Sequence, residues 1–98
     1  MLKTFYHATP FENLCSIMNK GIHKGIDGVV YLTEKPEDAI KFLIIRGYKE
    51  ILVCQVALEE DLIQESFDHN EEFFKCRAYM YSDDIDPYDI EEFYKYAI

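Results

Sequence analysis

Two short stretches of the sequence each join a strand signal to a helix start, and their order limits the folds open to this chain. Residues 3–8 alternate and are rich in aromatic side chains, which predicts a strand, and a helix start follows. Residues 29–32 are almost continuously apolar, which is typical of a buried strand. The first strand has His7 toward its carboxyl end and the second has Tyr31. Two such rings at the ends of two strands could hold a flat, polar ligand between them.

The two helices that follow these strands are expected to have defined ends. Thr9 is expected to cap the first helix, Glu12 to complete a capping box, and Gly21 to end the helix in a left-handed conformation. The second helix is predicted over residues 37–46, with Pro36 at its start and Gly47 after it. One face of this second helix is predicted to hold Ala39, Phe42, Leu43 and Arg46.

The rest of the chain is dominated by strand signals. Residues 50–57 give the clearest of them and predict a central strand. Residues 58–71 are acidic and irregular, with one helical turn expected at 59–64. Two further strands are predicted at residues 73–76 and 77–82, and the aromatic tail at 93–96 is expected to pack on the outside. This order of elements predicts an α+β fold, and the length of 98 residues fits a single domain spanning the whole chain, 1–98.

The net charge of −9 is distributed unevenly along the chain. Residues 1–50 hold seven Lys or Arg and six Asp or Glu, whereas residues 51–98 hold three and thirteen, so the halves have charges of +1 and −10. Proteins that bind nucleic acid need a basic surface to displace counterions, and the acidic half is unsuited to that role. This half could instead contact a basic protein or repel nucleic acid, or only keep the chain soluble.

The cysteines and the hydropathy bear on location. Cys15, Cys54 and Cys76 lie in apolar contexts without disulfide or zinc spacing, so we expect buried thiols in a reducing, cytoplasmic setting. No apolar run approaches the roughly 20 residues that cross a bilayer, and no membrane association is expected. His69 has acidic neighbours, but such local clusters are usually solvated loops, and we expect no metal site.

Taken in order, these motifs resemble the ADP-ribosyltransferase fold. Its members have a His-Gly-Thr strand before a helix, and later a strand with a hydrophobic residue, Tyr or His, Leu, and Ser or Thr. Residues 6–9 read Tyr-His-Ala-Thr, the first helix closes on Gly21, and residues 30–33 read Val-Tyr-Leu-Thr. The most similar variant is the NAD-binding half of tRNA 2′-phosphotransferases, in which a helix ends in Arg-Gly before an apolar strand, as residues 46–56 do here. The resemblance covers about residues 4–90 and implies a small split sheet with two N-terminal helices.

The resemblance implies a site for NAD or a related nucleotide. In such a site His7 would hydrogen-bond a ribose hydroxyl, and Tyr31 would pack against the nicotinamide ring. The backbone around Thr9 would face a polar ligand group, and Arg46 would lie near a phosphate, although Arg46 could also only complement the dipole at a helix C-terminus. The implied cofactor-binding residues are His7, Ala8, Thr9, Tyr31, Arg46 and Arg77, and the implied catalytic residues are His7 and Tyr31.

The sequence departs from the family pattern at three positions. Ala8 replaces the usual glycine, and Tyr31 is what toxin-like and poly(ADP-ribose) polymerase-like members have in the second motif. Those members also keep a late-strand glutamate that stabilises the cationic transition state. Residues 76–82 contain no glutamate, and Arg77 lies near the expected place. Three functions therefore stay open: ADP-ribose transfer from NAD to a protein or nucleic-acid acceptor, a non-catalytic member of the fold, and an acidic module or inhibitor that covers a basic nucleic-acid-binding surface.

Overall fold

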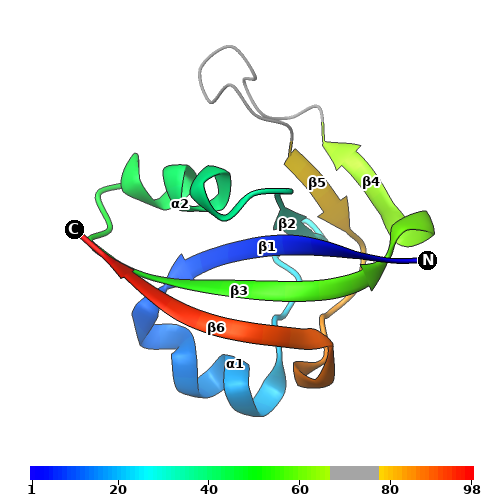
Figure 1. The fold of residues 1–98 in the computed structure, drawn as a ribbon, viewed down its shortest axis with the longest axis horizontal. Helices are drawn as coiled ribbons and strands as arrows, with labels where there is room; N and C mark the ends of the chain where they lie inside the picture. The colour runs from blue at the N-terminus through cyan, green and yellow to red at the C-terminus, as the bar shows by residue number, and fades with distance from the viewer. Residues whose placement is uncertain (67–77) are drawn as a thin grey trace.

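The computed structural model describes residues 1–66 and 78–98, which form two antiparallel three-stranded sheets and two α-helices (Figure 1). The strands of the first sheet lie in the order β1-β3-β6 and those of the second in the order β2-β5-β4. The predicted α+β fold is confirmed. No helix in the described ranges is long and apolar enough to cross a membrane. The elements are β1 (Leu2–Pro10), α1 (Leu14–Lys20), β2 (Val30–Leu32), α2 (Pro36–Ile44), β3 (Glu50–Glu59), β4 (Ile63–Ser66), β5 (Ala78–Tyr81) and β6 (Ile90–Ala97).

The first sheet has β3 at its centre, as its apolar run predicts. Residues 51–54 have no exposed area, because β1 and β6 pair on either side of β3 and the two helices cover its faces. Leu52 packs in one cluster with Ile17 of α1, and Val53 packs in another with Leu43 of α2. The two helices therefore lie on opposite faces of this sheet, as Figure 1 shows.

The second sheet meets the first at the edge of β1. Tyr6 and Thr33 exchange two backbone hydrogen bonds of 2.8 and 2.9 Å, and this bridge joins β1 to the end of β2. Phe5 packs against Tyr79 of β5, with ring centroids 5.7 Å apart, in the larger core cluster.

The start of the first helix differs from the prediction. β1 continues through Thr9 and Pro10, which pair with β3, so Thr9 lies in a strand and cannot cap. A 3₁₀ turn (Phe11–Asn13) then precedes α1, and neither helical start has a side-chain cap. The capping-box prediction was wrong because long-range pairing with β3 extended the strand past the local helix signal.

Gly21 ends α1 as predicted, in a conformation that only glycine adopts readily. Its φ of 79° is positive, but its ψ of −166° is extended, so the conformation is not that of the expected left-handed cap. A Cβ atom added there would lie 2.0 Å from the carbonyl oxygen of Ile85. The chain turns closely around this point, and Ile22 forms a β-bridge with Ile85 directly afterwards.

The second half of the chain contains more strand than expected. The helical turn expected at 59–64 is a 3₁₀ turn (Glu60–Leu62), but β4, which follows it, was not predicted. The tail at 93–96 lies within the edge strand β6, where it pairs with β3 and leaves Tyr94 and Tyr96 exposed, in agreement with the expected packing on the outside. The strand predicted at 77–82 is present as β5, and the one predicted at 73–76 lies outside the described residues.

The cysteines do not all have the expected burial. Cys54 is fully buried at the centre of β3, but Cys15 is exposed on α1, so the expectation of a buried thiol was wrong there. The helical face that packs on the sheet consists of Leu14 and Ile17, and Cys15 falls beside that face. Cys76 lies outside the described residues.

Candidate functional site

A cavity of about 330 Å³ lies between β1, β2 and α2. Ligand cavities in proteins typically have volumes of about 300–1,000 Å³ and combine apolar walls with a few polar groups. Most of the residues around this cavity are apolar or aromatic. The lining residues are Tyr6, His7, Ala8, Tyr31, Leu32, Thr33, Ala39, Phe42, Leu43, Arg46 and Ala78. We refer to this space as the main cavity.

One wall of the main cavity is formed by side chains of α2 and of the turn that follows it. Phe42 and Leu43 lie three and four positions after Ala39, and Arg46 lies four and three positions after them, and all four line the cavity. Ala39, Phe42 and Leu43 share a face of α2 as predicted, but the helix ends at Ile44 rather than at residue 46, so Arg46 lies in the turn that follows it. β1 supplies the facing wall through Tyr6 and Ala8, which pack in the same cluster as Leu43.

His7 has one ring nitrogen held by the backbone of the neighbouring strand. Its Nδ1 lies 2.9 Å from the carbonyl oxygen of Tyr31, and since a carbonyl only accepts, Nδ1 is the nitrogen with the proton. Burial lowers the pKa of His7 below its usual value of 6.5, and the bond to Tyr31 opposes this shift only in part. The imidazole is therefore neutral at pH 7, and its Nε2 is a hydrogen-bond acceptor.

Tyr31 lines the same cavity and has its hydroxyl anchored at the rim. The hydroxyl donates to Oδ2 of Asp27 at 2.7 Å, and Oδ1 of Asp27 accepts from the backbone N–H of Val29 at 3.4 Å. Val30 and Leu32 point into the core, so the alternation of β2 places Tyr31 on the opposite side of the sheet. Sequence reasoning missed Asp27, although Asp27-Gly28 is a turn signal directly before β2.

Arg46 provides the positive charge of the main cavity. It follows α2 and is exposed, and its guanidinium makes no ion pair or side-chain hydrogen bond with the residues that the structure describes. Among the described lining residues it is the one with a charged side chain, and none is acidic. The position suits an anionic group of a ligand and also the C-terminal dipole of α2.

Thr9 lies in a neighbouring cavity of about 200 Å³ on the α1 side of β1. Its Oγ1 accepts a hydrogen bond of 2.8 Å from Nδ2 of Asn13. His7 lines this second cavity as well as the main one. The structure thus brings His7, Ala8, Tyr31 and Arg46 around one cavity and places Thr9 in the next. The predicted site residue Arg77 lies outside the described residues.

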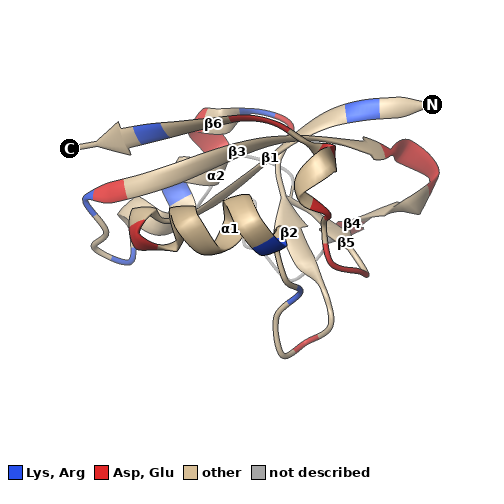
Figure 2. Cartoon of the chain, turned by 90° about the horizontal axis from the view of Figure 1, so that it is seen from below, with Lys and Arg blue, Asp and Glu red and all other residues tan. Residues whose placement is uncertain are grey.

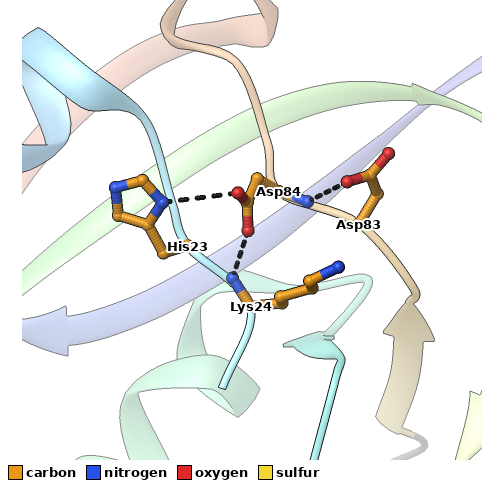
Figure 3. Close-up of polar contacts among 4 residues, drawn as sticks. All are labelled: His23, Lys24, Asp83 and Asp84. Atoms are coloured by element: carbon orange, nitrogen blue, oxygen red, sulfur yellow. Dashed lines mark hydrogen bonds and ion pairs between the residues drawn. The ribbon is translucent and has the colours of Figure 1, made fainter. Parts of the chain in front are cut away.

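Asp84 forms a carboxylate clasp with His23 and Lys24 of the loop after α1 (Figure 3), and His23 lines the second cavity. Oδ1 of Asp84 accepts from the backbone N–H of Lys24 at 2.7 Å, and Oδ2 lies 3.4 Å from Nδ1 of His23. These contacts lower the pKa of Asp84, the Lys24 N–H having the largest effect. Asp83 Oδ1 accepts from the backbone N–H of Asp84 at 2.8 Å. The clasp ties the loop after α1 to the loop after β5, so we assign it a structural role.

Neither a nucleophilic Cys54 nor a metal site is supported in the described part of the chain. Burial raises the pKa of Cys54 to about 12, so this thiol does not ionise near neutral pH and is not a nucleophile. No group of three or more His, Cys, Asp or Glu among residues 1–66 and 78–98 could hold a metal ion.

No protein-family model matches the chain, and no curated protein matches it either.

Proposed function

We propose that this chain has an ADP-ribosyltransferase-like fold and binds NAD, or a related nucleotide, in the main cavity. The nicotinamide–ribose end would lie between His7 and Tyr31. The observation that supports this most is that several of the implied site residues lie around the same cavity. Of the six residues implied as cofactor-binding, His7, Ala8, Tyr31 and Arg46 line one cavity, although they come from three separate segments of the chain.

The polar groups of the main cavity match the parts of such a ligand. The acceptor Nε2 of His7 suits a ribose hydroxyl, and the faces of Tyr31 and Phe42 suit a flat, weakly polar ring. Arg46 suits a phosphate. One ring contact and two hydrogen bonds would contribute about 2–4 kcal/mol to orienting the ligand.

If the nucleotide is also a substrate, the reaction transfers ADP-ribose to a protein or nucleic-acid acceptor. The bond between nicotinamide and ribose breaks through an oxocarbenium-like state, so catalysis depends mainly on positioning and electrostatic support. His7 and Tyr31 would supply the positioning by fixing the ribose and the leaving ring.

A second candidate is nucleotide binding without transfer. No acidic residue occurs among the described residues that line the main cavity, and β5 contains no glutamate. The nearby charge is Arg46, and a cation would oppose a developing oxocarbenium ion rather than stabilise it. This lack of a carboxylate favours a member of the fold that retains the site and has lost the chemistry.

The test is ligand-dependent stabilisation measured with matched variants. NAD at 100 times its dissociation constant would stabilise the wild type by about 2.7 kcal/mol, seen as a rise in melting temperature. We expect His7→Ala and Tyr31→Ala to lose this rise. His23→Ala, a histidine outside the main cavity, should keep it. Absence of any rise with millimolar NAD or ADP-ribose would contradict the proposal.

A second measurement separates the two candidates once binding is established. Nicotinamide is quantified after incubation with NAD and candidate acceptors. Release that disappears in His7→Ala supports transfer, and binding without release supports the non-catalytic candidate.

A further inference from the structure

β6 forms one edge of the first sheet, and in the described part of the chain it pairs only with β3. On the outer side of an edge strand, every second residue directs its backbone N–H and C=O away from the sheet. These groups form a row of donors and acceptors that matches another strand. The cavity proposed to bind the nucleotide lies along β1, at the opposite edge of this sheet.

Natural edge strands are usually protected, and β6 has little protection. Typical devices are shortness, proline, outward lysine or a bulge. β6 has eight residues and no proline, and its one lysine, Lys95, pairs with Glu50 of β3 at 2.8 Å. The β3–β6 register shifts between Gln55 and Val56, so Glu91 faces no residue of β3 in the register, although its Oε1 accepts from Nε2 of Gln55 at 3.4 Å. Residues 92–97 pair with β3 without interruption. In contrast, β4 at the edge of the second sheet has only four residues.

The side chains along β6 indicate what kind of strand fits. Between residues 86 and 97 the sequence has four acidic residues and one basic residue. Glu91 and Glu92 are exposed near the start of β6, and Figure 2 shows acidic positions there and a basic position toward its end. Tyr94 and Tyr96 are 37% and 41% exposed, and tyrosine is enriched at protein interfaces.

We infer that β6 is a docking edge for an extended, basic segment of another protein, which would pair with β6 as a fourth strand of the first sheet. Backbone pairing supplies the affinity, and the acidic side chains select a positively charged partner. A second copy of this chain fits less well, because two molecules with a net charge of −9 repel each other. This inference is independent of the nucleotide proposal.

A basic, strand-forming peptide tests directly whether β6 is a docking edge. The probe is Lys-Val-Lys-Thr-Lys-Val-Lys-Thr, blocked at both ends, titrated into the ¹⁵N-labelled chain. We expect amide shifts to concentrate in residues 90–97 and to weaken at high salt. A peptide with N-methyl groups on alternate residues, which cannot pair along one side, should bind about tenfold more weakly or worse. Equal binding of the methylated peptide, or shifts centred elsewhere, would overturn the inference.

Two matched charge variants show whether peptide binding depends on the charges of β6 or only on the net charge of the chain. Glu91→Lys with Glu92→Lys reverses two charges on β6, and Glu60→Lys with Asp61→Lys makes the same change on an exposed 3₁₀ turn. We expect the β6 pair to weaken binding about tenfold, since opposed like charges across strands are repulsive. The control pair should stay within about twofold, because its charges lie away from the edge. Equal losses would show that only net charge matters. A dimer formed through β6 in sedimentation would likewise overturn the inference in favour of self-pairing.

Discussion

Gly21 gives the sharpest prediction about the fold that supports the site. Its φ is 79°, and a Cβ atom there would lie 2.0 Å from the carbonyl oxygen of Ile85 and 2.9 Å from Cδ of Pro87. The backbone conformation alone costs a non-glycine residue about 1–3 kcal/mol. Relieving the overlap also separates Ile22 from Ile85, which exchange two hydrogen bonds of 2.8 Å, at about 1 kcal/mol each. We therefore expect Gly21→Ala to destabilise the chain by about 4 kcal/mol.

Two other glycines provide matched controls for this prediction. Gly28 and Gly47 have φ of 81° and 91°, but a Cβ atom at either would meet nothing within 4 Å. Their alanine variants should show only the backbone cost, about 1–2 kcal/mol. The assay is urea unfolding followed by circular dichroism. If Gly21→Ala were no less stable than Gly28→Ala, the close approach of the chain to Ile85 would be wrong.

Three further predictions concern ionisable groups. With Cys54 buried and its pKa raised to about 12, a thiol reagent at pH 8 should label Cys15 before Cys54, and labelling of Cys54, mapped by mass spectrometry, should require unfolding. The pKa of Asp84 is lowered on folding, so its contribution to stability is present above about pH 3.8 and is lost as pH falls through the folded value. The melting temperature of Asp84→Asn should therefore lie below that of the wild type at pH 7, and the gap should narrow in acid. Burial also lowers the pKa of His7 in the folded chain, so protonation of this histidine favours the unfolded state. The resulting loss of folding stability is absent above about pH 6.5 and grows as the pH falls below that value. Between pH 7 and 5 the wild type should lose melting temperature more steeply than His7→Gln, and a parallel loss in both would contradict this reasoning.

Local patterns predicted the elements that depend on a single periodicity. The strand signal at residues 50–57 predicted a central strand, and residues 51–54 are fully buried in β3. The spacing of Ala39, Phe42 and Leu43 predicted one face of α2, and that face forms a wall of the main cavity. Arg46, which the sequence placed on the same helix, lines the cavity from the turn that follows α2. In both cases the side-chain pattern and the tertiary contacts agree.

The failures occurred where distant contacts override local signals. Thr9 has the sequence context of a helix cap, but it pairs with Leu52 in the sheet, so β1 continues through it. Residues 93–96 lie on the outside as expected, but the sequence did not indicate that they pair with β3 as part of a strand. Asp27 contributes to the site through its bond to Tyr31, which requires the turn before β2 to place the carboxylate beside the phenol.

The measurement that tests the central claim most directly is an NMR titration of the ¹⁵N-labelled chain with NAD. If the nucleotide binds between the two sheets, the largest amide shifts will occur at residues 6–8, at 31–33 and around Arg46, and His7→Ala will abolish them. If millimolar NAD causes no saturable shifts, or shifts only at residues remote from the main cavity, the proposed nucleotide site is wrong.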